Sequence, residues 1–258
     1  MNNASCPDSP AVVVTGAASG IGRATVQRFL VENTPVIGID VDRDGLDSLA
    51  SACRDGRELL RTLECDVTSV SAVERCFSTI EAWSVTLRGL VTCAGANFSL
   101  NPLLATETEF DRAFDLNVKS VWSCVKYAIP LMQPDSAVVA VSSIHATRTT
   151  TGLFPYAATK SAVVGLVRSL ALELAPRGVR VNCVAPGWTR SAITDRVFAE
   201  AGEPAAYRSM IDAIHPLGRI AEPEEIGDVI VFLCGGSASF ITGAEFTVDG
   251  GIGALLPA

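Results

Sequence analysis

Short runs of β-branched and other apolar residues alternate along this chain with longer segments that have helical periodicity. Most of the apolar runs lack the polar and apolar alternation of a half-exposed strand, so each is expected to be buried on both faces. Buried strands separated by helices form a parallel sheet with helices packed on each side. The predicted fold class is therefore α/β, a doubly wound parallel sheet whose ligands bind at the carboxyl ends of the strands. The predicted strands span residues 11–15, 35–40, 60–66, 87–95, 137–143, 179–187 and 244–251.

The length of the chain and the lack of a linker pattern predict one domain. A chain of 258 residues suits a single large α/β unit, and no stretch rich in proline, glycine and serine divides residues 1–258. One long segment, 188–217, mixes aromatic and basic residues with alanine, glycine and proline and has no clear strand pattern. Long inserts in compact domains are commonly binding loops, so we expect a substrate-binding lid there.

Charge and composition argue against several classes of partner. The net charge of -8, from 20 basic against 28 acidic residues, disfavours a nucleic-acid partner. The two histidines, His145 and His215, belong to no cluster with metal-ligand spacing, so no metal is expected. The eight cysteines never form a CxxC pair, which is typical of reduced thiols. Because the start, MNNASCPDSP, also resembles neither a secretory signal nor a membrane anchor, we expect a cytoplasmic protein with no membrane partner.

The first predicted turn from strand to helix, residues 15–22, has the sequence TGAASGIG. Its glycines permit a tight turn and close approach of the backbone to a pyrophosphate, while free N–H groups at the start of the helix attract the phosphates. Asp40 ends the second predicted strand, where a carboxylate can accept hydrogen bonds from the ribose hydroxyls of an adenosine and repel a 2′-phosphate. No basic residue lies within the turn, which favours NAD, but Arg43 is close enough to keep NADP as the alternative.

The segment YAATK, residues 156–160, opens an apolar helical pattern. Tyr156 and Lys160 lie one helical turn apart and therefore project from one face. A nearby ammonium favours phenolate, and lowering the tyrosine pKa from ~10 to 7 requires roughly 4 kcal/mol. The spacing predicts Tyr156 as a general base toward an alcohol and a general acid toward a ketone. Ser143 ends the fifth predicted strand, so its hydroxyl is expected to bond the substrate oxygen at the same edge of the sheet.

Together with further motifs in the same order, the glycine turn and YAATK resemble the short-chain dehydrogenase/reductase family in its single-domain branch. The resemblance covers roughly residues 12–251. The chain departs from the family pattern at Cys93, where asparagine is usual, and at Ser191, where threonine is frequent. The cysteine removes one expected hydrogen bond of the central strands but touches no step of the chemistry. The further motifs are CDV (65–67), TCAG (92–95), DLNVKS (115–120), VSS (141–143), VAPG (184–187) and ITGAEFTVDGG (241–251).

The resemblance implies a Rossmann fold of about seven strands and assigns roles to individual residues. Lys160 is expected to bond the nicotinamide ribose, and Asn117 to hold a water that links Lys160 to solvent. The expected catalytic residues are Asn117, Ser143, Tyr156 and Lys160. The residues expected to contact the cofactor are Gly16, Ser19, Gly20, Ile21, Gly22, Asp40, Asp66, Val67, Ala94, Gly95, Tyr156, Lys160, Gly187 and Thr189.

Some of these residues have a second interpretation. Asp66 either flanks the adenine or belongs to the capping region of the next helix. His145 either faces the substrate together with Ser143 or bonds only to backbone groups. Trp188 forms either a substrate wall or ordinary packing.

The resulting hypothesis is an NAD-dependent oxidoreductase that transfers a hydride between a secondary alcohol and the nicotinamide, with Tyr156 as general base. The small-molecule substrate is a sugar or polyol, a cyclic alcohol or a hydroxy acid. One alternative is an NADPH-dependent ketone reductase of a biosynthetic pathway, and another is a non-catalytic protein that binds NAD to regulate a partner. An acidic acyl-carrier partner is disfavoured, because residues 133–137 (QPDSA) and 170–175 (LALELA) lack the basic residues that such reductases carry.

The helix that begins at YAATK is predicted to be apolar on more than one face. Such a helix needs a second partner, and residues 118–132 are similarly apolar. Both segments suggest a subunit interface, and the family resemblance implies a homotetramer or homodimer. The alternative is that the helix is simply buried within one subunit.

Overall fold

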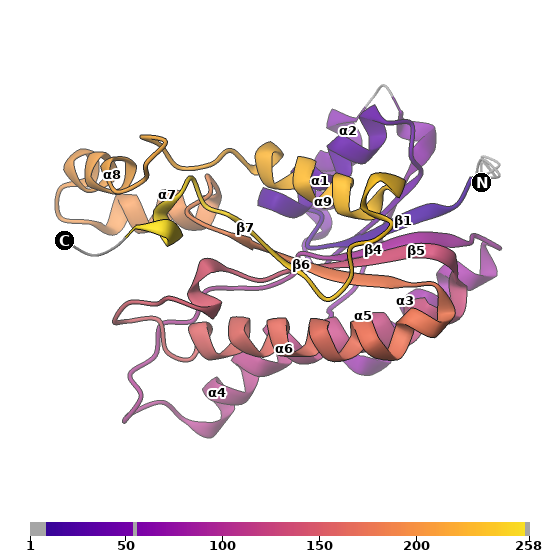
Figure 1. Cartoon of the computed structure of the whole chain (residues 1–258), viewed down its shortest axis with the longest axis horizontal. Coiled ribbons are helices and arrows are strands. Elements are labelled where there is room, and N and C mark those ends of the chain that lie inside the picture. The colour runs from indigo at the N-terminus through magenta and orange to yellow at the C-terminus, as the bar shows by residue number, and fades with distance from the viewer. Residues whose placement is uncertain (1–8, 54–55, 256–258) are drawn as a thin grey trace.

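A parallel sheet of seven strands forms the centre of the computed structural model, which describes residues 9–53 and 56–255 (Figure 1). Its strand order is β3-β2-β1-β4-β5-β6-β7, and each neighbouring pair runs parallel. This confirms the predicted doubly wound fold. The strands are β1 (Ala11–Thr15), β2 (Val36–Asp40), β3 (Leu60–Glu64), β4 (Leu87–Thr92), β5 (Met132–Val141), β6 (Arg180–Pro186) and β7 (Glu245–Val248).

Helices cover both faces of the sheet. On one face, α1, α2 and α9 bury a core that includes Phe29 and Ile230, and on the other α3, α5 and α6 bury a core that includes Phe77 and Val167 (Figure 1). Strands covered on both sides need apolar residues at every position, which explains their continuous apolar sequences. The helices are α1 (Gly20–Val31), α2 (Arg43–Ala52), α3 (Val70–Ala82), α4 (Glu107–Phe114), α5 (Ser120–Ala128), α6 (Tyr156–Leu174), α7 (Ala192–Glu200), α8 (Pro204–Ala213) and α9 (Pro223–Cys234).

The order of the strands fixes where a ligand can bind. From β1 the chain builds outward through β2 and β3, then returns to place β4 on the other side of β1. Helices after β1 and β4 therefore pass over opposite faces and leave a crevice at the carboxyl ends of these two strands. The glycine turn after β1, Asp66 and Val67 after β3, Ala94 and Gly95 after β4, Ser143 after β5 and Gly187 after β6 all follow strand ends at this edge.

Several predicted strands extend beyond the observed ones. Residues 65–66, 93–95 and 249–251 leave the sheet and form the turns at its carboxyl edge. Their apolar or glycine-rich sequences continue the pattern of the preceding strands, and this is why the sequence predicts longer strands than the structure has. In the other direction, β5 begins at Met132, where it pairs with Leu87 before a register shift.

The predicted lid, 188–217, contains two helices, α7 and α8. Its interior is a small cluster of its own, in which Phe198, Ile211 and Ile220 are buried. The Trp188 ring stacks on Phe198, with centroids 5.8 Å apart and an interplanar angle of 9°. The segment is thus a compact helical unit and not an irregular loop.

The described residues contain no helix that is long and apolar enough to cross a membrane. The cysteines among them are free thiols, and Cys6 lies outside the described residues. Within the same ranges, no group of three or more histidine, cysteine, aspartate or glutamate side chains could hold a metal ion.

Candidate active site

The glycine turn between β1 and α1 is held in close contact with the end of β4. Gly16 has a φ of +67°, and a Cβ there would lie 2.8 Å from the backbone nitrogen of Ala94. A Cβ at Gly22 would overlap the carbonyl oxygen of Gly16. The chain itself therefore requires both glycines, and the bare backbone that results is also what a pyrophosphate needs in order to approach.

The first turn of α1 provides the groups that a dinucleotide phosphate would bind. Ser19 is the N-cap residue, but its side chain makes no capping hydrogen bond, and the first turn carries no acidic residue. Backbone N–H groups and a hydroxyl at a helix N-terminus are suited to an anion. The residues present thus fit the phosphates of a nicotinamide dinucleotide, and the roles of Ser19, Gly20 and Ile21 toward them stay a prediction.

Asp40 lies at the end of β2 beside this turn. Its Oδ2 accepts a hydrogen bond from the N–H of Ala18 at 2.9 Å, and its Oδ1 accepts one from the N–H of Asp42 at 3.0 Å. The carboxylate therefore both anchors the glycine turn and presents its remaining lone pairs at the crevice. Arg43, which kept NADP open as an alternative, donates through Nε to Asp47 at 3.3 Å on the exposed face of α2.

The second and third residues after β3, Asp66 and Val67, differ in their exposure to solvent. Val67 is buried, whereas Asp66 is exposed and accepts hydrogen bonds at Oδ1 from the backbone N–H and hydroxyl of Thr68. Ser69, not Asp66, is the N-cap residue of α3. The aspartate thus stabilises the turn that leads into the helix, and both residues lie at the edge of the sheet where the adenine was expected.

Ser143, Tyr156 and Lys160 come together where β5 ends and α6 begins. Ser143 is buried, its Oγ accepts a hydrogen bond from the N–H of His145 at 3.2 Å, and its side chain hydrogen-bonds to the phenol of Tyr156. The hydroxyl of Ser142 donates to the carbonyl of Lys160 at 3.1 Å and ties the strand end to the helix. The three predicted side chains therefore share one site, in a geometry set by the main chain.

The prediction that Lys160 lowers the pKa of Tyr156 is wrong for the protein without a bound cofactor. Burial raises the pKa of the Tyr156 phenol, and the hydrogen bond with Ser143 only opposes that rise. The Lys160 Nζ lies 5.7 Å from the centroid of the tyrosine ring and donates instead to the carbonyl of Val141 at 2.9 Å. Stabilising the phenolate therefore requires a further positive charge near the ring.

Lys160 is buried, and burial lowers its pKa to about 8. A group titrating there remains largely protonated at neutral pH. The adjacent thiol of Cys93 is neutral, because burial raises its pKa to about 12. Lys160 is thus the cation of the site, and Gly95 packs against its Nζ.

Asn117 lies on a π-helical segment, Asp115–Lys119, that joins α4 to α5. Its side chain is buried and is fully engaged. Oδ1 accepts from the N–H of Ala96 at 3.0 Å, while Nδ2 donates to the carbonyl of Ala96 and to the Thr159 hydroxyl, each at 3.0 Å. Asn117 therefore clamps the turn after β4 to α6, and its predicted water-holding role stays a prediction.

Gly187 and Thr189 follow β6. Gly187 donates its N–H to Val248 at 2.9 Å and packs against Asp249, so the end of β7 lies directly beside it. Thr189 is buried, its hydroxyl donates to the Gly187 carbonyl at 3.2 Å, and its carbonyl accepts from Thr194. These contacts hold the start of the lid at the crevice.

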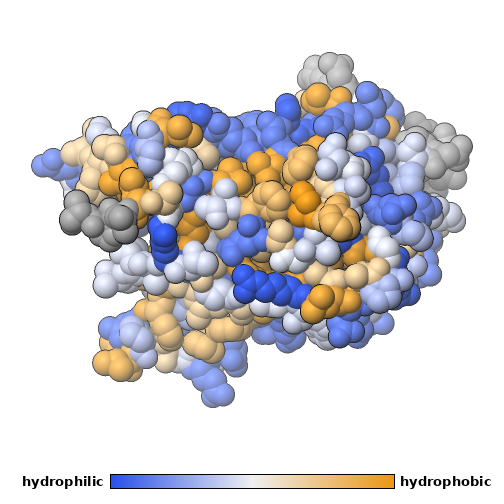
Figure 2. Space-filling model, in the orientation of Figure 1, coloured by the Kyte–Doolittle hydropathy of each residue, from blue (hydrophilic) through white to orange (hydrophobic). Residues whose placement is uncertain are grey.

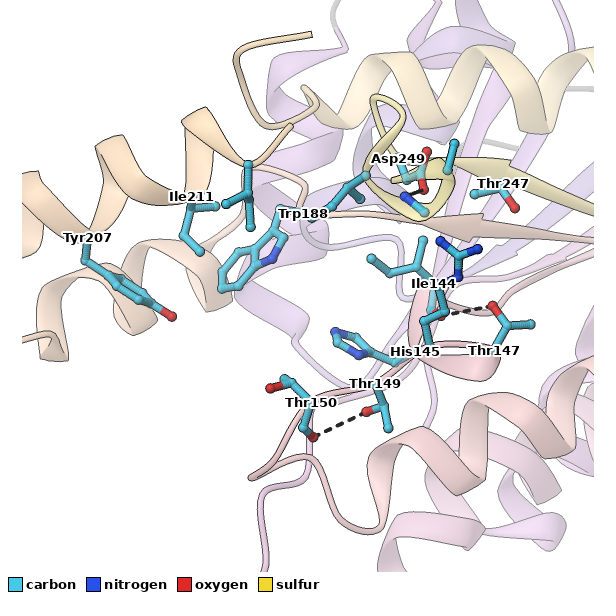
Figure 3. Close-up of a pocket in the computed structure, with 15 residues that line it drawn as sticks. Ile144, His145, Thr147, Thr149, Thr150, Trp188, Tyr207, Ile211, Thr247 and Asp249 are labelled. Carbon is cyan, nitrogen blue, oxygen red and sulfur yellow. Dashed lines mark hydrogen bonds between the residues drawn. The ribbon is translucent and has the colours of Figure 1, made fainter. Parts of the chain in front are cut away.

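A cavity of about 710 Å³ is lined by the turn that directly follows Ser143, from Ile144 onward (Figure 3), while Ser143 and Tyr156 themselves are not part of its lining. His145 and Trp188 face it from opposite sides, and α8 contributes Tyr207 and Ile211. The His145 ring lies 6.0 Å from that of Tyr156, and among the described residues its buried Nδ1 has no hydrogen-bond partner. Burial lowers the pKa of His145, so a neutral imidazole faces the cavity.

Several residues of the site were missed in the sequence. Thr159 bridges Asn117 to the Tyr156 carbonyl, and Asp249 and Ile252 close the cavity from the C-terminal turn. The position of Thr159 inside YAATK was an available signal, because it lies one turn from Tyr156. Nothing in the local sequence of the C-terminal turn indicates that it reaches the cavity.

A glycine turn suited to a dinucleotide, together with a buried serine, a half-buried tyrosine and a buried lysine at the carboxyl edge of a parallel sheet, defines the class of Rossmann-fold oxidoreductases. The family model described as "Enoyl-(Acyl carrier protein) reductase" matches residues 16–253. The chain belongs to the short-chain dehydrogenase/reductase family and is an oxidoreductase that acts on CH–OH groups with a nicotinamide cofactor.

Relatives of known name support this assignment over nearly the whole chain. The cis-4-hydroxycyclohexanecarboxylate dehydrogenase of Sinomonas cyclohexanicum is 36% identical, and the match covers 94% of this chain and 96% of the relative. The 3-oxoacyl-[acyl-carrier-protein] reductase of Thermotoga maritima is 32% identical, with 93% and 96% covered. Among solved structures, the ligand-free aldohexose dehydrogenase of Thermoplasma acidophilum has a TM-score of 0.88 at 31% identity, with 97% and 96% covered.

Proposed function

We propose that this protein oxidises a secondary alcohol to a ketone with NAD, reversibly, through Ser143, Tyr156, Lys160 and Asn117. The observation that carries the proposal is that buried Ser143 and buried Lys160 both lie at the half-buried phenol of Tyr156, and that the turn after Ser143 lines a cavity large enough for a small substrate. The bound nicotinamide supplies the acceptor for the hydride that leaves the carbinol carbon.

The chain provides position and proton transfer. Ser143 donates a hydrogen bond to the substrate oxygen and orients it. Tyr156 removes the hydroxyl proton as the hydride departs, so one C–H and one O–H bond break while the C=O bond forms. Lys160, whose Nζ donates to the carbonyl of Val141, would bind the nicotinamide ribose. Asn117 keeps the β4 turn, and with it the floor of the site, fixed against α6.

The choice of NAD rests on Asp40 and Arg43. Asp40 is fixed by two backbone N–H groups at the position where an adenosine ribose would lie, so a 2′-phosphate there would meet a negative charge. Arg43, the basic residue nearest in sequence, already pairs with Asp47. The specific observation that favours the alternative, an NADPH-dependent ketone reductase, is the likeness to the acyl-carrier-protein reductase.

Purified protein is expected to form reduced cofactor from NAD with at least one secondary alcohol. The panel should contain cyclic alcohols, hydroxy acids, diols and aldohexoses, because relatives are named for a hydroxycyclohexanecarboxylate, for meso-2,3-butanediol and for aldohexose. Turnover with NADP alone would promote the reductase. Binding of NAD without turnover of any alcohol, or of any ketone with NADH, would favour the non-catalytic NAD-binding alternative.

The protein is further proposed to be a homotetramer or homodimer. Leu172 on α6 is 78% exposed and Trp122 on α5 is 42% exposed, on the two helices expected to form an interface. Apolar surface also gathers over α9 near β7 (Figure 2), where Phe232 is partly exposed, and Phe240 between these elements is fully exposed. Exposed apolar patches of this kind mark contacts between subunits.

Light scattering is expected to give a mass of two or four chains of 27.0 kDa. The double variant Trp122→Glu and Leu172→Glu should weaken the assembly by at least about 100-fold, because it buries two unpaired charges at the interface. Arg57→Glu, a charge change beside the far edge of the sheet, is the control. A monomeric wild type, or a double variant that keeps its mass, would contradict the interface.

A further inference from the structure

The cavity beside Tyr156 has one group whose charge has no counterpart in the chain. Arg148 lines the cavity, and among the described residues its guanidinium makes no hydrogen bond or ion pair. No other lysine or arginine belongs to the lining that the structure describes. Arg148 is an exposed residue of this lining, so its guanidinium is free to pair with an anionic group of a bound substrate.

The turn that carries Arg148 is fixed. Residues Ile144–Ala146 form a 3₁₀ turn directly after Ser143, and the N–H of Arg148 donates to the carbonyl of Ile144 at 3.0 Å. The turn begins with the Ser143 hydroxyl accepting from His145. The backbone of Arg148 is therefore held by the same short segment that positions Ser143. The position of the guanidinium is thus coupled to the position of the substrate oxygen that Ser143 would bind.

Asp249, the acidic residue of the described lining, does not pair with Arg148. Asp249 accepts hydrogen bonds from the N–H groups of Gly251 at 2.9 Å and Gly253 at 2.7 Å, one with each carboxylate oxygen. It caps the C-terminal turn (Figure 3) and forms no ion pair within the described residues. Its charge is thus committed to backbone groups of its own turn.

The other residues that line the cavity determine which part of a ligand can lie against them. Trp188, Ile211 and Ile214 form an apolar wall. The hydroxyls of two lining threonines are already donated to backbone carbonyls, Thr147 to Ile144 and Thr149 to Thr150. An acid with a hydrocarbon body fits this combination, because its body can lie against the apolar wall while its carboxylate pairs with Arg148.

We propose that Arg148 binds the carboxylate of the substrate, which is a hydroxy acid whose apolar body lies against Trp188 and Ile211. The carboxylate is remote from the reacting oxygen, which is held by Ser143 and Tyr156. This inference rests on the proposed function for the identity of the reacting group. The binding of the acid by Arg148 does not depend on turnover and can be measured without it.

Two probes of the same shape separate charge from size: cyclohexanecarboxylate and cyclohexanecarboxamide. Calorimetry of the wild type with saturating NADH is expected to show about 10- to 100-fold tighter binding of the carboxylate, which is the usual value of a hydrogen-bonded charge pair. Arg148→Gln should remove this preference by weakening only the carboxylate. Arg168→Gln, an exposed arginine on α6 away from the cavity, should keep it.

Equal affinities of the two probes in the wild type would overturn the proposal, as would a preference that survives in Arg148→Gln at an unchanged melting temperature. A charge preference that depends on Arg148 in a protein without dehydrogenase activity would support the binding site while sinking the proposed function. Turnover of neutral alcohols only, unaffected by Arg148→Gln, would support the proposed function and overturn the carboxylate site.

Discussion

Tyr156→Phe is expected to lower kcat for alcohol oxidation by about 10³-fold, because it removes the group that takes the hydroxyl proton. The ring remains, so its edge contact with His145 and the start of α6 are retained. Cofactor affinity, measured by fluorescence titration with NADH, should change by less than about 3-fold, because only one of many contacts is altered. The loss should therefore appear in kcat and not in binding.

The control is Tyr127→Phe, which removes an equivalent hydroxyl from α5, far from Ser143, and should leave kcat unchanged. The pH profile gives a second readout. Burial raises the pKa of Tyr156, so oxidation, which needs the phenolate, should become faster as pH rises, whereas ketone reduction, which needs the phenol, should become slower. A Tyr156→Phe enzyme that keeps more than a tenth of the wild-type kcat with the same pH profile would exclude the tyrosine as the base.

The raised pKa of Tyr156 shows that the spacing of two residues in a sequence predicts their positions on a helix but not their electrostatic interaction. The positions of Tyr156 and Lys160 on one face follow from helical geometry alone. Their electrostatic coupling does not, because Lys160 Nζ donates to the carbonyl of Val141 and burial raises the pKa of Tyr156. In the proposed mechanism, the positive charge of the oxidised nicotinamide lowers the pKa of the Tyr156 phenol toward neutral pH.

The fold could be predicted from sequence because burial on both faces of a parallel strand leaves a direct trace in composition. The glycine turn was equally visible, because overlaps with the backbone force glycine at 16 and 22. Asn117 was singled out only through the family resemblance, and its clamp was not predicted, since it joins residues as distant as Ala96 and Thr159. Part of the cavity was predicted, because the lid, Trp188 and His145 all line it, whereas the wall from the C-terminal turn, Asp249 to Ala254, was not, because that turn meets η4 (Ile144–Ala146) and the lid only in the folded chain.

Asp40→Asn is expected to lower the ratio of kcat/KM for NAD to that for NADP by at least about 100-fold. A carboxylate facing a phosphate costs several kcal/mol, and each 1.4 kcal/mol is tenfold. The amide keeps the shape of the side chain and one oxygen that can accept from Ala18 or Asp42, so the glycine turn is retained. A ratio within one variant is also insensitive to a general loss of active protein.

Asp44→Asn provides the matched control, because it removes an equal charge from the exposed first turn of α2 and makes no contact with the glycine turn. If only the loss of net negative charge mattered, both variants would shift the ratio alike. If Asp40 acts through its place at the end of β2, only Asp40→Asn will do so. An unchanged ratio with a lower melting temperature would mean that Asp40 serves the fold alone, and the preference for NAD would then have to come from another part of the crevice.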